Sequence, residues 1–250
     1  MPETIVESPA QLSEPPGQYS PSWALQAVFN HPALSDITLL VDDTKLYGHR
    51  DVLVPLSGYM EHSLDWTAHR DLKDDFKPSV RILLPALKVP ARFRAAAMLH
   101  SRAYWFEVYL QVVYGMHRLT QDDPAELFVI AQIADFMISP KAVSICDHLL
   151  SSLTYGTQDA LSVALFALRY SLSRTFQVVQ IIISANLRQF FTDPLLYKID
   201  PEKFAKVITN SPDSDFYPYW ASISYECPFY SRDLPMMQSD GERRNTMSII

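Results

Sequence analysis

The spacing of apolar residues changes from the period of a strand to the period of a helix along this chain. The runs "DITLLV" (36–41) and "KLYGH" (45–49) are rich in β-forming residues, and the pair Asp42-Asp43 between them supplies turn chemistry. Together they predict a β-hairpin. "VRILLP" (80–85) predicts a further strand that ends at its proline. A capping serine and apolar residues within 22–29 predict a short helix ahead of the hairpin.

Helical spacing dominates from residue 91 onward. Residues 91–115 predict one long helix or two, ending at Gly115. Asp123-Pro124 and Ser139-Pro140 each place a capping residue before a proline that fits the first helical turn, and so predict two more helix starts. Beyond residue 155 the pattern is purely helical. The chain therefore predicts an α+β fold, with a small sheet followed by helices.

Composition narrows the classes of protein. The 250 residues are 48% apolar, which is enough for a substantial core, and the net charge of −7 argues against general nucleic-acid binding. Apolar runs are interrupted well before the roughly 20 residues that a bilayer requires, so no membrane segment is expected. The start of the chain lacks the pattern of a signal peptide. We expect an intracellular protein of the cytoplasm or the nucleus.

Candidate chemistry is sparse. His49 between glycine and arginine could be a base or a metal ligand, but a structural residue capping the helix that follows is favoured. Cys146 and His148 lie two apart on a predicted helix, so their side chains diverge and no metal site is expected. Phosphate loops, dinucleotide-binding turns and nucleophile elbows are missing. The sequence predicts neither an enzyme nor a cofactor.

Three stretches in order resemble the BTB/POZ family. "SDITLLVDDTKLYGHRDVLVPLSGYM" (35–60) is similar to its first half, in which a hairpin precedes a His-[Lys/Arg] motif and a Ser-x-[aromatic] motif. "FEVYLQVVYG" (106–115) resembles a helix end of that family. "LFVIAQIADFMISPKAVSICDHLL" (127–150) resembles its closing helix pair. The resemblance implies a small β-sheet flanked by helices over residues 21–151.

The remaining segments complete the expected organisation. Residues 152–210 resemble the helical BACK extension that often follows a BTB domain. Residues 1–20 have the composition of a disordered tail, and residues 211–250 are expected to be irregular and partly mobile. The aromatic residues between positions 216 and 230 are either a peptide-binding surface or a cover for the last helices. A segment of about 86–105 is longer than the family needs and predicts an inserted helix.

The resemblance implies a protein interaction adaptor. It implies a homodimer, with interface residues Trp23, Ala24, Val28, Phe29, Asp36 and Arg50. It also implies a face for a cullin scaffold, formed by Tyr59, Met60, Leu72, Asp74 and Tyr114. The expected function is that of a substrate adaptor for a cullin-type ubiquitin ligase, acting on an unknown protein substrate. The alternative is a dimeric scaffolding or transcriptional-corepressor module that binds no cullin.

Two departures from the family bear on this choice. Adaptors that recruit a cullin usually carry a hydrophobic-x-Glu triplet, for which this chain offers only Leu72-Lys73-Asp74. The inserted segment is the most basic stretch of an acidic chain. Its residues Arg92, Arg94 and Arg102 are either a solvated helix face or a docking patch for an acidic partner.

Overall fold

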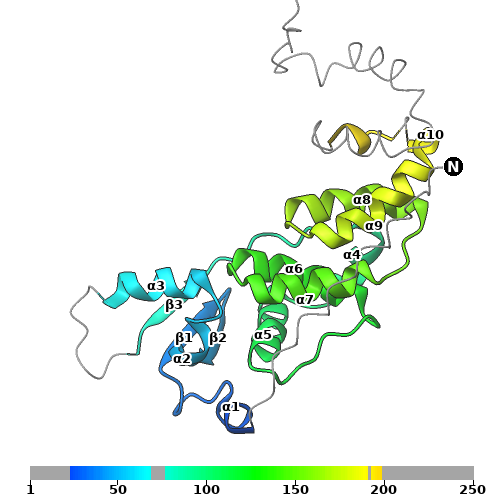
Figure 1. Cartoon of the computed structure of the whole chain (residues 1–250). Helices are drawn as coiled ribbons and strands as arrows, with labels where there is room; N and C mark the ends of the chain where they lie inside the picture. The colour runs from blue at the N-terminus through cyan, green and yellow to red at the C-terminus, as the bar shows by residue number, and fades with distance from the viewer. Residues whose placement is uncertain (1–22, 69–76, 191–192, 199–250) are drawn as a thin grey trace, which may run out of the picture.

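The computed structural model describes residues 23–68, 77–190 and 193–198. A three-stranded sheet in the order β2-β1-β3 lies near one end of the molecule (Figure 1). β1 (Ile37–Val41) and β2 (Thr44–Gly48) form the expected antiparallel hairpin, with Val41 opposite Thr44. β3 (Ser79–Ile82) pairs with β1 in parallel. The sheet is therefore mixed, and the coarse expectation of an α+β fold is confirmed.

Helices precede the hairpin and connect its second strand to β3. α1 (Trp23–Val28) precedes the hairpin as expected. The connection from β2 to β3 contains α2 (Arg50–Leu53) and α3 (Gly58–Ala68), and it carries the chain past β1 to the opposite edge of the sheet. Residues Ile37, Leu39 and Val41 of β1 are all buried, as the two-residue period of a strand predicts.

The stretch from residue 91 to residue 115 divides into two helices. α4 (Ala91–Ala97) lies in the segment where a helix was expected, and α5 (Arg102–Val113) begins where the Ser101 hydroxyl accepts from the Tyr104 N–H at 3.1 Å. The stretch ends at Gly115, whose φ of 71° suits glycine. α5 is buried on most of its surface because it lies between the sheet and the next helix pair (Figure 1).

The middle layer consists of α6 (Pro124–Phe136) and α7 (Pro140–Ser151). Asp123 caps α6 as expected, since its carboxylate accepts from the Glu126 N–H at 3.0 Å. Ser139 occupies the same position before α7, but its side chain makes no capping bond. Its hydroxyl donates instead to the Leu56 carbonyl at 2.6 Å. A capping residue followed by proline therefore marks both helix starts, although only Asp123 makes a capping hydrogen bond with its side chain.

The expected helical continuation is present as α8 (Thr157–Arg169), α9 (Ser173–Ala185), α10 (Leu187–Phe190) and a 3-10 turn, Leu196–Lys198. α8 and α9 form the outer layer above α6 and α7 (Figure 1). The rings of Phe128 and Phe166 join the two layers edge-on, with centroids 4.9 Å apart. Buried residues from the sheet to α10 belong to one continuous hydrophobic cluster. No helix within the described ranges is both long and apolar enough to cross a membrane.

Candidate interaction surfaces

His49 joins the hairpin, the chain after α1 and the end of α5 through its ring. Nε2 lies 3.1 Å from the Leu34 carbonyl oxygen, and Nδ1 lies 3.0 Å from the Tyr114 hydroxyl. Because a carbonyl oxygen can only accept, we assign the proton to Nε2 and let Nδ1 accept from Tyr114. The Tyr114 oxygen also accepts from the His49 backbone N–H at 2.9 Å. Both ring nitrogens are thus used within the chain, as a structural histidine requires.

His49 occupies the N-cap position of α2, and Asp36 supplies the side-chain contact at the start of this helix. His49 has the extended backbone of a cap residue, but its side chain makes no capping hydrogen bond. The Asp36 carboxylate accepts from the Arg50 N–H at 2.9 Å, which brings negative charge to the positive end of the helix. His49 therefore holds the cap position of α2 as expected, but with its backbone alone, since its ring bonds Leu34 and Tyr114. Asp36 and Arg50, expected at a dimer interface, are already joined within one chain, and both remain exposed.

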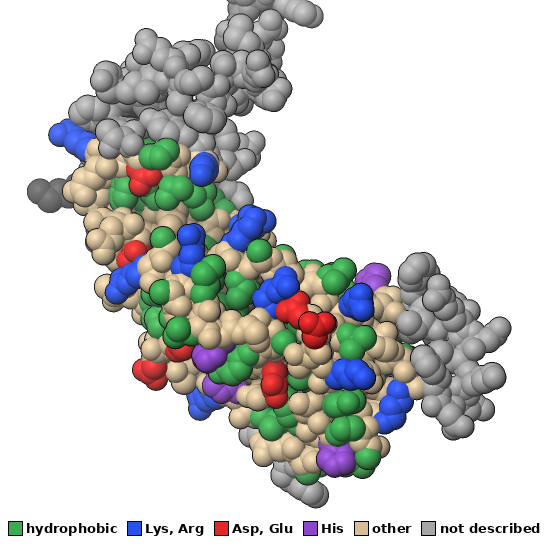
Figure 2. Space-filling model, turned by 180° about the vertical axis from the view of Figure 1, so that it is seen from behind, with side chains coloured by type: hydrophobic (Ala, Val, Ile, Leu, Met, Phe, Trp, Pro, Cys, Tyr) green, Lys and Arg blue, Asp and Glu red, His purple; other side chains and the backbone are tan. Residues whose placement is uncertain are grey.

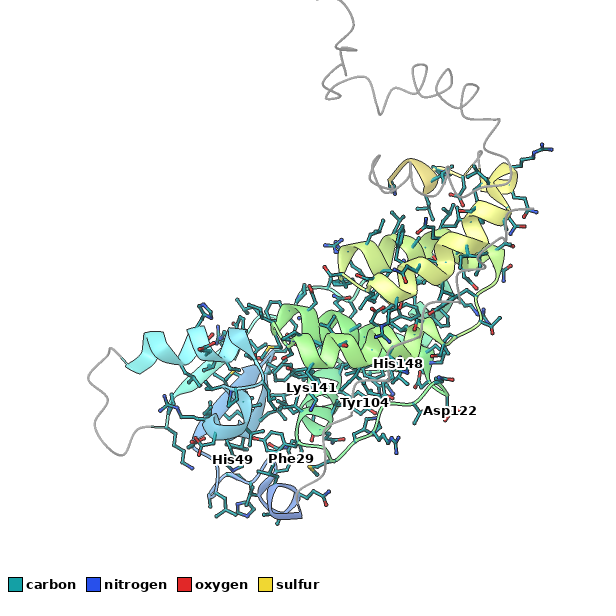
Figure 3. All side chains as sticks on the ribbon, in the orientation of Figure 1. Phe29, His49, Tyr104, Asp122, Lys141 and His148 are labelled. Atoms are coloured by element: carbon teal, nitrogen blue, oxygen red, sulfur yellow. The ribbon has the colours of Figure 1, made fainter. Side chains whose placement is uncertain are left out.

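Helix α1 packs on its own chain with one side only. The Phe29 ring meets the Tyr114 ring edge-on, with centroids 5.1 Å apart, and Leu25 also packs on the core. Figure 3 shows Phe29 and His49 together beside α1. Ala24 is exposed, and Val28 is half-buried without joining the core. The side chain of Trp23 lies outside the described residues. Among the described residues, Ala24 is therefore exposed and Val28 partly exposed, so both can contact another molecule.

The expected cullin face is not continuous at the surface. Met60 is fully buried and Tyr114 is 1% exposed, so neither side chain can reach a partner. Their assignment to that face is wrong. Met60 and Leu64 are four residues apart on α3 and both are buried, a spacing that indicates a core side. Of the five expected residues only Tyr59 is described and partly exposed. Leu72 and Asp74 lie outside the described residues.

Two of the three inserted-segment arginines have partners within the chain. Arg92 reaches Asp159 at 2.9 Å and ties α4 to the first turn of α8. Arg102 bonds Asp42 at 2.7 Å and the Leu84 carbonyl at 2.9 Å, which holds the start of α5 against the hairpin turn. Arg94 is exposed. The docking patch stays a prediction, but only Arg94 presents its charge without a carboxylate partner among the described ion pairs.

Sequence reasoning missed the apolar residues between α4 and α5. Met98, Leu99 and Tyr104 are 64%, 78% and 43% exposed. The run "AAAMLHS" (95–101) held the signal, because two large apolar residues directly follow the last alanine of a short helix. The view from behind shows apolar and basic side chains next to each other on one face (Figure 2).

A groove of about 460 Å³ lies between the α6–α7 turn and the α8–α9 turn. Its lining includes Ile138 from the first turn, Val143 from α7 and Ser171 from the second turn. Two carboxylates reach it. Burial raises the pKa of Asp135, and Arg169 opposes that shift. The Asp147 carboxylate is already hydrogen-bonded within the chain, because it accepts from the backbone N–H groups of Arg174 and Thr175 at the start of α9.

Cys146 and His148 on α7 make contacts within the chain. Burial raises the pKa of the Cys146 thiol far above its usual range, with further increases from Glu126 and Asp147. This thiol therefore stays protonated and packs in the core, as expected. His148 accepts a hydrogen bond from Arg174 at 3.1 Å. No group of three or more potential metal-binding side chains occurs in the part of the chain that the structure describes.

Comparison with known proteins adds no relative. No known protein family has a sequence model that matches this chain. No curated protein matches it either.

Proposed function

We propose that this protein is a non-enzymatic adaptor of the BTB/POZ type, which forms a homodimer through α1 and brings a protein substrate to a cullin-type ubiquitin ligase. Its mechanism is proximity, because the adaptor raises the concentration of the substrate near the enzyme and a dimer doubles the number of binding sites. The resemblance of three stretches to that family is the sequence basis of the proposal.

One structural observation supports it best: polar side chains link the three stretches directly. His49 of the first stretch bonds Tyr114 of the second, and Tyr109 of the second bonds Ser139 of the third at 2.5 Å. Ser57 of the first donates to the Met137 carbonyl of the third at 2.7 Å. Buried polar groups must find partners, so residues that resemble one family pattern here satisfy each other in a common core.

The dimer surface fits the uncovered side of α1. Phe29 packs on Tyr114 and fixes the helix, while Ala24 and Val28 remain available. Leu34, in the turn after α1, is 55% exposed and extends this apolar surface. A second copy of the chain would remove these side chains from water, which favours association.

We place the cullin contact at the start of α3 and not at Met60 or Tyr114. The Gly58 N–H donates to the Ile138 carbonyl at 3.1 Å, so this end of α3 lies against the α6–α7 turn. Tyr59 is partly exposed there, and its ring packs on Phe136 with centroids 5.2 Å apart. Ile138 is 57% exposed and also lines the groove. Tyr59 and Ile138 thus offer an apolar contact beside a groove.

A dimeric scaffold or corepressor module without a cullin is the second candidate. The burial of Met60 and Tyr114 favours it, since the surface expected for the cullin loses two members. Leu72-Lys73-Asp74 in place of the usual glutamate triplet favours it as well.

Co-purification with a cullin of the BTB-binding class separates the two candidates. The wild-type chain is expected to retain the cullin at micromolar concentration, and Ile138→Asp is expected to lose it. Ile181→Asp on α9 is the matched control, because Ile181 is 71% exposed and lies outside this contact. A folded wild-type dimer that retains no cullin would support the scaffold instead.

A further inference from the structure

The turn between α4 and α5 carries an apolar surface that the proposed dimer and cullin contacts do not use. Met98, Leu99 and Tyr104 lie within seven residues of sequence and are 64%, 78% and 43% exposed. Single exposed apolar residues are normal on proteins, whereas a group of them marks a binding surface or an aggregation risk. We call this surface, together with His100 and Arg94, the α4–α5 corner.

Hydrogen bonds hold the backbone of the α4–α5 corner in one shape. The Trp105 indole N–H donates to the Ala97 carbonyl at 2.8 Å and closes the turn from the inside. Trp105 and Ala97 are both buried. The Ser101 hydroxyl fixes the first turn of α5 by accepting from Tyr104. The exposed residues therefore stand on a buried and hydrogen-bonded base.

Aromatic contacts order two side chains of the corner, His100 and Tyr104. The His100 ring stacks on the Tyr104 ring, with centroids 4.0 Å apart and an interplanar angle of 21°. It also meets the Trp105 ring edge-on at 5.4 Å. Figure 3 shows Tyr104 near the middle of the molecule. A surface that is already ordered loses little side-chain freedom on binding, which favours affinity.

The charged residues of the segment that forms the α4–α5 corner are all basic. Residues 77–106 contain no Asp or Glu, although the whole chain has a net charge of −7. Arg92 and Arg102 use their charge on Asp159 and Asp42. Arg94 lies four residues before Met98, which places both on the same side of the chain as it leaves α4. The corner thus combines apolar contact area with one exposed cation.

We propose that the α4–α5 corner binds an acidic peptide segment of another protein, in which one or two large apolar side chains adjoin an Asp or Glu. The apolar side chains would cover Leu99 and Met98, and the carboxylate would pair with Arg94. One exposed arginine among apolar groups suits a peptide better than a nucleic acid, which needs several cations along its backbone. The proposal goes beyond the adaptor function and requires neither the dimer nor the cullin.

Peptide selection against the full-length chain tests the proposal without knowledge of the natural partner. A random peptide library displayed on phage is enriched on the wild-type protein, and the dissociation constants of the enriched peptides are measured by fluorescence anisotropy. We expect enriched peptides that combine Leu, Phe or Trp with Asp or Glu. Leu99→Asp should weaken their binding at least about tenfold, as loss of a central contact does. Ile181→Asp, equally exposed on α9, should leave binding unchanged.

A charge reversal tests the role of Arg94 separately. Arg94→Glu should weaken the enriched peptides, and the same peptides with Lys in place of their acid should bind this variant better than they bind the wild type. Absence of any enriched peptide, enrichment of peptides without acids, or equal binding to Leu99→Asp would each overturn the proposal. Unchanged thermal melting and unchanged molecular mass of the variants show that neither folding nor the dimer is at fault.

Discussion

Replacing Tyr114 with phenylalanine removes one buried oxygen and leaves the ring in place. That oxygen accepts the His49 backbone N–H at 2.9 Å and donates to His49 Nδ1 at 3.0 Å. Tyr114 is 1% exposed, so water cannot replace the hydroxyl without rearrangement. An unsatisfied buried donor costs about 1–3 kcal/mol, and we expect the Tyr114→Phe variant to lose about that free energy of unfolding.

Alkaline pH supplies a second readout of the same hydroxyl. Burial raises the pKa of Tyr114 from 10.0 to about 12; the His49 hydrogen bond opposes the rise, and Asp36 adds to it. Because the pKa is higher in the folded chain, the resulting stability is complete below pH 10.0 and is lost as the pH rises toward 12. This shift corresponds to about 2–3 kcal/mol. The advantage of the wild type over Tyr114→Phe should therefore shrink across this pH range.

Urea unfolding followed by circular dichroism at several pH values measures both effects. Tyr104→Phe is the matched control, because Tyr104 is 43% exposed and its loss of a hydroxyl should change stability by less than about 0.5 kcal/mol. Equal stability of Tyr114→Phe and the wild type at neutral pH would refute the role given to this hydroxyl. A difference that stays constant up to pH 12 would refute the assignment of the raised pKa.

Two further predictions concern other parts of the fold. Arg92→Ala removes the partner of the Asp159 carboxylate, which is only 8% exposed. Because Arg92 itself is 56% exposed, we expect the free energy of unfolding, measured with urea, to fall by only about 1–2 kcal/mol. The control Arg94→Ala should change it little. Gly115→Ala should lower stability by about 1 kcal/mol in the same assay, since φ is 71° there. Gly156→Ala, at a φ of −78°, should cost less, about 0.5 kcal/mol, because it weakens only the N-cap of α8. Equal effects of the two alanines would contradict the backbone argument.

Local sequence patterns predicted individual helices and hairpins better than the contacts between distant segments. The turn pair Asp42-Asp43 and the cap Asp123 were readable because hairpin turns and helix starts depend on neighbouring residues. The parallel pairing of β3 with β1 was not, since it joins residues about forty positions apart across two helices. The side-chain contact at the start of α2 was not readable for the same reason. Asp36 precedes Arg50 by fourteen residues, and only the hairpin brings them together.

Side-chain direction limited the prediction of the candidate surfaces. Tyr59 and Met60 are neighbours on α3 and point in different directions, so Met60 faces the core while Tyr59 stays partly exposed. The resemblance implied Tyr114 at the cullin face, yet its hydroxyl bonds His49 inside the protein. The arginines of the inserted segment could not be divided into paired and free from sequence, because Asp159 lies far along the chain from Arg92.

Self-association through α1 is the claim on which the proposed function depends most directly. Light scattering after size-exclusion chromatography gives the mass of the full-length chain in solution. We expect the wild type at twice the chain mass of 28.5 kDa and the folded Val28→Asp variant at that mass once. Ile181→Asp should remain a dimer. A wild-type protein that runs at 28.5 kDa at micromolar concentration would contradict the account.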